Sequence, residues 1–304
     1  GKPLFVIGMV ERDLAKPATL SKGDISATTQ PLPSRWSTSP LDHRMPLRPL
    51  DAETMERTIA KLVNGAPSKS LVSFLLERSQ GLPYVAEFLI SKLAREKKLY
   101  QRQGDREWVQ KKTAERLSVY SVDAVVAEEF AALPENEAAH LRAAAVVGRI
   151  FWSEALSRVL PVCDPQVLVR LTQKRWIVEH AHSRYSSTEE YTFTMNTLQE
   201  QIYATVAEEE RARVHRLVAL WQWERYHGAL EEMSLLSHHY AGCGDEPEAT
   251  IFLQRIGDTC RRFGANEEAL ANYRRLLAMR VDTQRREDVE SAVHALETAL
   301  EEKN

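Results

Sequence analysis

Two pairs of histidines have a spacing that could serve metal chemistry. His180 and His182 alternate on a predicted strand, which places both side chains on one face, and His238 and His239 are adjacent on a predicted helix. An open catalytic metal site needs three protein ligands, and the sequence identifies no third ligand for either pair. We therefore interpret these residues as ordinary polar or half-buried histidines and predict no metal site.

The motifs of nucleotide hydrolysis and of nucleophilic catalysis are missing from the sequence. It holds no G-x-x-x-x-G-K-[ST], no other glycine-rich phosphate loop, and no acidic cluster after an apolar strand that could hold magnesium. No Ser/His/Asp or Cys/His arrangement can be identified either. We predict that this chain has no catalytic residues and is not an enzyme by itself.

Arg12 is the residue best placed to contact a phosphate. It follows the apolar run Leu4–Val10, whose β-branched residues and lack of alternation predict a strand buried on both faces. In a parallel-sheet ATPase the ligands lie beyond the carboxyl ends of the strands, so a guanidinium here could reach a γ-phosphate. The alternative, a solvated strand end without a ligand, fits the residues equally well.

Basic residues near a predicted helix raise the question of DNA binding. The helix expected over 165–174 and the hairpin that follows it supply four of them: Arg170, Lys174, Arg175 and Arg184. Acidic residues flank the hairpin loop, namely Glu179, Glu189 and Glu190. The apolar stripe of the helix must also face a core, as it consists of Val167, Leu168 and Leu171. Because no basic face results, the pattern disfavours a nucleic-acid partner.

The composition is that of an ordinary globular protein. Of its 304 residues, 43% are hydrophobic and 27% are charged, and the net charge of -3 gives no reason to expect a polyanion partner. The three cysteines are far apart and lack CxxC spacing, which favours a reducing compartment. Without a membrane-spanning run or signal peptide, we expect a cytoplasmic location. The missing initiator Met and the start on a buried strand favour a segment cut from a longer polypeptide.

Residues 14–50 are rich in Pro, Ser and Thr, which predicts an irregular connection with one short strand in Leu41–Leu50. From Asp51 the pattern becomes helical. Asp51 and Ser68 are expected N-caps, and Gly81-Leu82-Pro83 separates the second helix of this part from the third. Three amphipathic helices are therefore expected before Lys97, and they form a small helical unit.

Residues 119–207 predict helices followed by a β-hairpin. After a first helix that ends before Pro134, the expected helices cover Glu135–Val147, Trp152–Leu160 and Pro165–Lys174, and the expected strands cover Trp176–His180 and Tyr191–Met195. Three helices and then a hairpin is the order of a winged helix, although other α+β domains share it.

From Asn196 onward the pattern predicts only helices. They cover Leu198–Ala207, Glu209–Tyr226, Leu230–Tyr240, Glu248–Phe263, Glu267–Met279 and Arg285–Leu300. The segment Gly244–Ala249 lines up with Gly264–Ala269, so a unit of break plus helix recurs. This recurrence predicts a tetratricopeptide-like α-solenoid without the full consensus. The aromatic residues of these helices are expected mainly to pack neighbouring helices together.

Six segments, taken in order, resemble successive blocks of the STAND-class signalling ATPases. They are LFVIGMVER, LRPLDAETMERTIAKLV, LLERSQGLPYVAEFLISKL, LPENEAAHLRAAAVVGRIFW, YTFTMNTLQEQIY and RARVHRLVALW. The resemblance covers nearly the whole chain. It is to the bacterial type in which an AAA-like, NB-ARC-like module precedes a winged helix and tetratricopeptide-like helices, often fused to a protein kinase, a nucleotide cyclase or a DNA-binding head.

The resemblance implies a mainly α fold in four parts. Residues 1–50 would be the tail of an AAA-like ATPase sheet with its connecting loop, and residues 51–118 a helical lid. Residues 119–207 would form a winged-helix-like domain, and residues 208–304 tetratricopeptide-like repeats. The Walker A and Walker B segments would lie before residue 1.

The resemblance also implies nucleotide contacts. Arg12 matches the sensor arginine, and Gly81 and Pro83 match a G-x-P element whose proline lies against the adenine; Leu82 stands where the family usually has Asn. Met195 stands where the family commonly has a histidine that reaches the β-phosphate, and methionine cannot donate that hydrogen bond. We expect a weakened nucleotide latch, no cofactor in this chain alone, and ATP or ADP with Mg in the intact protein.

We expect the chain to be a regulatory protein-interaction and signal-relay segment of a STAND-type ATPase. Its protein partners would bind through the helical repeats, while no membrane and no nucleic acid is expected to bind; the oligomeric state of the intact protein stays open. One alternative is an ATP- or ADP-binding switch whose P-loop lies upstream, with Arg12, Gly81 and Pro83 as its contacts in this chain. A second alternative is a winged-helix transcriptional regulator.

Overall fold

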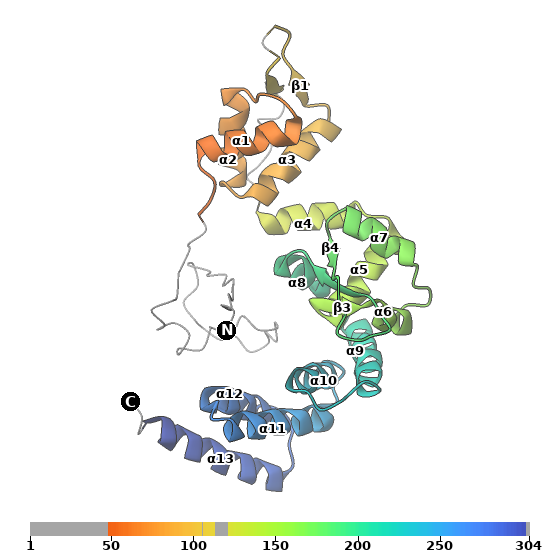
Figure 1. Ribbon diagram of the computed structural model, residues 1–304, viewed down its shortest axis with the longest axis vertical. Coiled ribbons are helices and arrows are strands. Elements are labelled where there is room, and N and C mark those ends of the chain that lie inside the picture. Colours follow the sequence, from red (N-terminus) through yellow and green to blue (C-terminus); the bar gives the residue numbers. More distant parts are fainter. Residues whose placement is uncertain (1–47, 105, 113–120, 302–304) are drawn as a thin grey trace, which may run out of the picture. The chain divides into compact units, whose positions relative to one another are not determined.

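A computed structural model describes residues 48–104, 106–112 and 121–301 of the chain. The chain divides after Ser121 into two compact units (Figure 1). The predicted strand Leu4–Val10, Arg12 and most of the strand expected in Leu41–Leu50 lie outside the described residues. The last three residues of that segment, 48–50, belong to no strand.

The first unit contains three helices and a β-hairpin. The helices are α1 (Ala52–Val63), α2 (Lys69–Ser79) and α3 (Pro83–Arg95), and each packs against the other two. Their starts confirm the predicted caps, because the Asp51 side chain accepts a hydrogen bond from the Thr54 amide at 2.8 Å and Ser68 Oγ accepts one from the Leu71 amide at 3.2 Å.

The hairpin of the first unit was not expected from the sequence. Strands β1 (Leu99–Gln101) and β2 (Trp108–Gln110) pair in antiparallel fashion with Tyr100 opposite Val109. Three residues are too few to give a periodic pattern, and only Val109 is buried, so these strands carry no alternation that sequence reasoning could detect.

The second unit begins with helices built around a three-stranded sheet. Its elements, in chain order, are α4 (Val122–Ala131), α5 (Glu135–Val147), β3 (Ile150–Trp152), α6 (Ser153–Val159), α7 (Pro165–Gln173), β4 (Ile177–Glu179), β5 (Glu190–Phe193) and α8 (Asn196–Ala204). The strands lie in the order β3-β5-β4 with antiparallel pairing throughout, Phe151 and Glu179 both opposite Tyr191. The hairpin β4–β5 therefore confirms the two strands predicted on either side of residue 185.

Strand β3 corrects one prediction. The helix expected over Trp152–Leu160 begins only at Ser153, because Trp152 is the last residue of a strand that pairs with β5. The partner residues, Tyr191 and Glu190, lie about 40 residues further along the chain, which is why a local pattern could not indicate the pairing.

The rest of the second unit is an array of five helices, each packed on the next. They are α9 (Glu208–Trp223), α10 (Leu230–Gly242), α11 (Glu246–Arg262), α12 (Asn266–Leu277) and α13 (Thr283–Glu301). Figure 1 shows α10 to α13 lying side by side. Their shared core is formed chiefly by Leu236, Phe252, Leu253, Tyr273 and Leu276.

The turns before α11 and α12 have the same conformation. Gly244 and Gly264 have φ values of +80° and +73°, a left-handed conformation in which glycine is favoured. In each turn the following amide bonds to a carbonyl five residues back: Asp245 to Tyr240 at 2.8 Å, and Ala265 to Cys260 at 2.9 Å. The alignment of Gly244–Ala249 with Gly264–Ala269 thus corresponds to two equivalent helix–turn–helix corners.

The described residues confirm that the chain is mainly helical, with few and short strands. No helix in the described part of the chain combines the length and apolar character that a membrane crossing requires.

Candidate functional site

The Gly81–Pro83 turn, predicted to face a nucleotide, packs against its own chain. Gly81 has a φ of +75°, and its carbonyl accepts a hydrogen bond from the Leu50 amide at 2.8 Å. A Cβ on Gly81 would lie 2.8 Å from the Leu50 carbonyl oxygen. Pro83 is the first residue of α3, where its fixed φ suits a helix start. The approach of the 49–50 segment therefore accounts for the glycine without a ligand, and the nucleotide contact stays a prediction.

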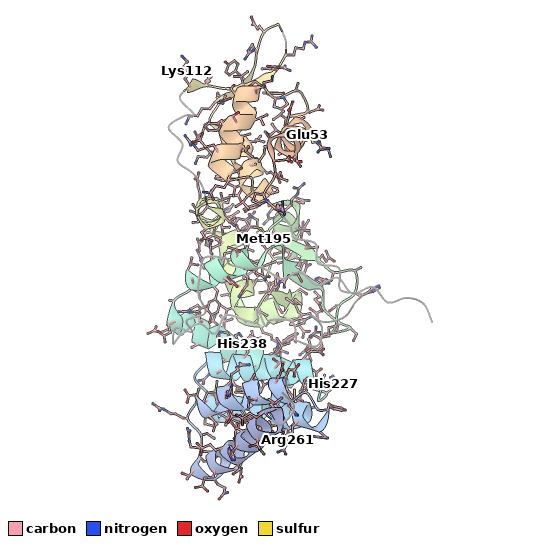
Figure 2. All side chains as sticks on the ribbon, turned by 90° about the vertical axis from the view of Figure 1, so that its left-hand side faces the viewer. Glu53, Lys112, Met195, His227, His238 and Arg261 are labelled. Carbon is pink, nitrogen blue, oxygen red and sulfur yellow. The ribbon has the colours of Figure 1, made fainter. Side chains whose placement is uncertain are left out.

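Met195 lies at the junction of the sheet with α8. It is the half-buried residue that immediately precedes α8, and its side chain makes no capping hydrogen bond to that helix. Figure 2 shows Met195 well separated from His238 within the second unit. A thioether at this position supplies packing rather than a charge or a strong donor.

The basic residues of α7 are engaged within the protein. Arg170 Nε and Lys174 Nζ lie 3.2 Å and 2.6 Å from the two carboxylate oxygens of Glu137, whose side chain is only 4% exposed. Glu137 lies in the first turn of α5, where the helix dipole also favours a negative charge. We call these three residues the Glu137 cluster. Because both cations neutralise a buried carboxylate, they are poorly available to DNA phosphates.

The loop between β4 and β5, which is the loop of the predicted hairpin, is likewise held by contacts to the rest of the second unit. Glu190 is buried and accepts hydrogen bonds from Trp152 Nε1 at 3.0 Å and from the Arg184 amide at 2.8 Å. The Arg184 guanidinium lies 6.0 Å from the centre of the Trp152 ring. These contacts fix the loop between β4 and β5 on the sheet.

Helix α9 joins the sheet-containing part of the second unit to the helical array. It packs against α5 and α6 on one side and α10 on the other. Its Trp221, 1% exposed, meets Trp152 of β3 at 5.5 Å and Tyr185 at 5.3 Å between ring centres. The Arg225 guanidinium covers the Trp221 ring at 4.7 Å and pairs with Glu154 of α6 at 2.5 Å. We call this contact the Trp221 junction.

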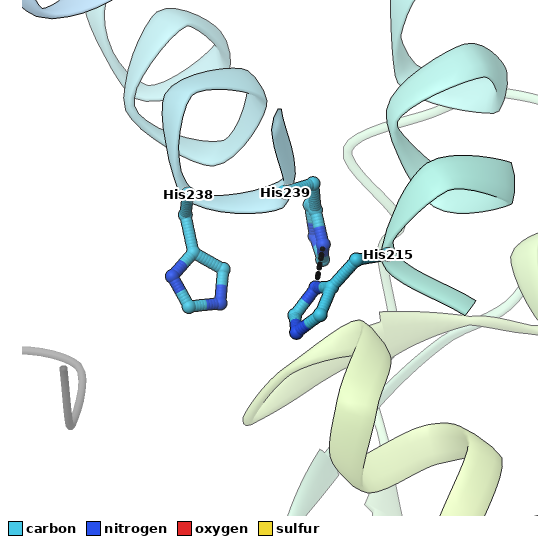
Figure 3. A group of neighbouring side chains, drawn as sticks. All are labelled: His215, His238 and His239. Carbon is cyan, nitrogen blue, oxygen red and sulfur yellow. Dashed lines mark hydrogen bonds between the residues drawn. The ribbon is translucent and has the colours of Figure 1, made fainter. Parts of the chain in front are cut away.

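The two histidine pairs have different surroundings. His180 and His182 are exposed, and His180 Nε2 lies 2.6 Å from Thr192 Oγ1 on the paired strand. By contrast, His238 and His239 of α10 meet His215 of α9, as Figure 3 shows. One ring nitrogen from each of these three lies within 4.8 Å of the others. His215 is thus a neighbour of the pair at 238–239 that the sequence did not identify, and the prediction of no metal site stays a prediction.

The histidine cluster, His215, His238 and His239, is held by hydrogen bonds and close packing. His215 Nδ1 and His239 Nδ1 are 2.8 Å apart, and His215 Nε2 is 3.2 Å from the Tyr203 hydroxyl of α8. A Cβ on Gly242 would lie 2.5 Å from His215 Cδ2, so the absence of a side chain there lets α10 approach the imidazole closely.

Burial keeps these imidazoles neutral. Desolvation, with the nearby His238 and Arg211, lowers the pKa of His215 to about 3. Desolvation, with Arg275 of α12, lowers the pKa of His238 to about 4. The pKa of His239, which has no exposed surface, also falls well below its ordinary value for the same reason. A neutral imidazole carries one nitrogen lone pair, which can accept a hydrogen bond or bind a metal ion.

Comparison with known proteins adds no family or relative: no protein-family model and no curated protein matches this chain.

Proposed function

We propose that the chain is a regulatory signal-relay and protein-interaction segment, of the kind found after the nucleotide-binding module of STAND-type ATPases, and that it has no catalytic activity of its own. In this proposal residues 119–207 are a winged-helix-like domain and residues 208–304 are tetratricopeptide-like repeats. The observation that carries the proposal is the Trp221 junction. Through it, α9, the first helix of the array, packs against the sheet-containing part as well.

The fold of each part is consistent with this assignment. The order α5, β3, α6, α7, β4, β5, with the sheet order β3-β5-β4, supports the winged-helix assignment, although other α+β domains share this order. The equivalent corners at Gly244 and Gly264 are typical of stacked helical repeats. Repeats of this kind act mostly as binding surfaces for other proteins.

Signal relay requires that a conformational change in the helical array also changes the conformation of the sheet. Packed aromatic rings and a guanidinium that is both stacked and ion-paired form a rigid contact. Close-packed protein interiors respond to a displacement by discrete rearrangement rather than by gradual compression. The Trp221 junction supplies such a joint, with Arg158 of α6 and Glu224 pairing at 3.0 Å beside it. A partner bound to the helices could therefore shift the sheet.

Exposed apolar side chains support protein interaction. Trp223 is 51% exposed although its neighbour Trp221 is buried, and its ring stacks on Tyr226 at 5.4 Å between centres. Leu220 and Leu230 are exposed at the same end of α9 and at the start of α10. Apolar groups of this size at a helix–helix turn are suited to a protein partner.

Hydrogen exchange measured by mass spectrometry tests the relay. The variant Leu253→Ala, which opens the core of α11, should lower amide protection in α10 to α12 and also in β3 to β5. In the double variant with Trp221→Ala, the effect of the Leu253 substitution on β3 to β5 should disappear. Leu220→Ala, next to Trp221 on α9 and 53% exposed, is the matched control and should leave the transmission intact. Equal protection of β3 to β5 with and without Leu253→Ala would refute the relay.

The alternative of a nucleotide switch is tested by calorimetry. The proposal predicts no heat of binding when this chain is titrated with ATP or ADP in Mg. The switch alternative instead expects a longer chain with an upstream P-loop to bind through Arg12, Gly81 and Pro83, so Arg12→Ala and Pro83→Ala in that longer chain are the informative variants. Loss of nucleotide binding in both would favour the switch. For the second alternative, the Glu137 cluster argues against a DNA-reading α7.

A further inference from the structure

Three imidazoles from two helices meet at one point of the second unit. His238 and His239 are consecutive on α10, and His215 of α9 lies against both, with ring centres 5.3 Å from His238 and 5.0 Å from His239 (Figure 3). Consecutive helical residues point about 100° apart, so a third ring can contact both only from the side between them. The packing of α9 on α10 provides that approach.

The hydrogen bonds of the cluster fix the orientation of its rings. Two neutral imidazoles share one proton across the 2.8 Å contact between His215 Nδ1 and His239 Nδ1, so one ring donates and the other accepts. Nε2 of His239 is buried, and the backbone of Val147 lies within hydrogen-bonding reach of the His239 ring. A backbone partner for one nitrogen of His239 orients the ring and leaves the other nitrogen facing His215.

We propose that His215, His238 and His239 together bind one divalent transition-metal ion, with Zn²⁺ as the best fit. Each residue contributes one ring nitrogen, and a water molecule completes a tetrahedral shell. Imidazole nitrogen is a preferred donor for Zn²⁺, Cu²⁺ and Ni²⁺, whereas Mg²⁺ and Ca²⁺ take oxygen ligands. Because all of its protein donors are imidazole nitrogens, the site should prefer these transition-metal ions over Mg²⁺ and Ca²⁺.

The surroundings fit such an ion. Zn–N bonds of about 2.0–2.1 Å place tetrahedral ligand nitrogens about 3.3 Å apart, so the 2.8 Å contact between His215 and His239 needs to widen by only about half an ångström. The Tyr203 hydroxyl at His215 Nε2 acts as the outer partner that leaves Nδ1 for the metal. Gly242 supports the same ring from the other helix.

The charges near the cluster set a limit on its affinity. Arg211 acts on His215 and Arg275 on His238, and both cations oppose a bound dication.

The test is a titration of the whole chain with Zn²⁺ in competition with a chromophoric chelator. We expect one ion per chain. His238→Ala, which removes a half-buried ligand, should weaken binding by more than the roughly 10–100-fold typical of outer-shell changes. His180→Ala removes an exposed histidine that lies outside the cluster, and it should leave the affinity unchanged. Circular dichroism of each variant checks that it is folded.

Two further measurements address the geometry. Gly242→Ala keeps all three ligands but displaces the His215 ring, so it should lower Zn²⁺ affinity about as much as an outer-shell change. Co²⁺ in place of Zn²⁺ should give the intense visible bands of a four-coordinate ion, and His238→Ala should abolish them. Equal Zn²⁺ affinity in the wild type and His238→Ala, loss of binding in His180→Ala, or no binding by the wild type below millimolar Zn²⁺ would overturn the proposal.

Discussion

The second unit buries two polar clusters, and they avoid the cost of burying an unpaired charge in different ways. At Glu137, Arg170 and Lys174 bring two cations to the two oxygens of a buried carboxylate. The imidazoles of His215, His238 and His239 lose their charge instead. Transfer of an unpaired charge out of water costs several kcal/mol, so either compensation or neutralisation is required.

The difference teaches where each cluster is vulnerable. The Glu137 cluster depends on partners, so it fails when a partner is removed. The histidine cluster requires neutral, closely packed rings, so it is destabilised when acid protonates the rings or when a new side chain displaces them. Four predictions test this contrast, in order of decreasing effect.

The largest effect is expected when both cations of the Glu137 cluster are removed. Arg170→Ala combined with Lys174→Ala leaves a buried carboxylate unpaired, which should lower the free energy of unfolding by about 3–5 kcal/mol. Guanidinium denaturation at neutral pH measures this. Glu137→Gln should cost less, about 1–3 kcal/mol, because the cations left behind are half exposed and can be hydrated.

The control for this contrast is an exposed pair. Arg158→Ala removes an ion pair with Glu224 in which both side chains are about half exposed, and it should cost less than about 1 kcal/mol. A double variant at Arg170 and Lys174 that loses no more stability than Arg158→Ala would contradict the idea that the buried carboxylate needs its partners.

Mild acid should weaken the metal-free chain through the histidine cluster. The folded-state pKa values of about 3 for His215 and about 4 for His238 lie below the ordinary 6.5, so the unfolded chain binds more protons as the pH falls below 6.5. The contribution of these histidines to the free energy of unfolding is therefore complete above pH 6.5. As the pH decreases below that value, the free energy of unfolding falls by about 1.4 kcal/mol per pH unit for each such histidine.

The pH effect is measured by denaturation at several pH values between about 6.5 and 5, with a chelator present. His238→Gln should reduce the slope of the free energy of unfolding against pH by the contribution of one histidine, about 1.4 kcal/mol per pH unit. Removal of an exposed histidine by His182→Gln should leave the slope unchanged. Identical slopes for the wild type and His238→Gln would mean that the ring at 238 is not kept neutral by burial.

Gly242→Ala should destabilise the joint between α9 and α10 by about 1–3 kcal/mol, because the new Cβ collides with the His215 ring. The better helix propensity of alanine offsets part of this cost. Thermal denaturation measures the change, and Ser234→Ala at an exposed position of α10 is the control. A more stable Gly242→Ala variant would show that the imidazole has room to move.

The smallest effect is expected for Tyr203→Phe. The substitution removes the hydroxyl that contacts His215 Nε2 and leaves the ring packing intact, so the cost should be about 0.5–1.5 kcal/mol. Comparison with Tyr226→Phe, whose ring packs on Trp223 and Phe252, separates the hydrogen bond from general effects of the substitution. Equal losses in both variants would argue against a specific contact between Tyr203 and His215.

Local features of the fold were predictable because their causes lie within a few residues. Asp51 and Ser68 cap helices through amides three residues ahead, and Gly244 and Gly264 supply the left-handed turn that follows a helix. Strand β3 was missed because its three residues gain their conformation from pairing with β5. The hairpin of β1 and β2 was missed because it is too short to show alternation.

The sequence by itself determined where most helices run, the repeat of the helix–turn corners, and the absence of a phosphate-binding loop, because these follow from spacing and residue type. Only the tertiary structure decided which charged and polar groups meet. Nothing local links Glu137 to Lys174, 37 residues away, or His215 to His239, 24 residues away. Such contacts form when amphipathic helices bury their apolar faces, and the geometry of that packing selects the polar partners.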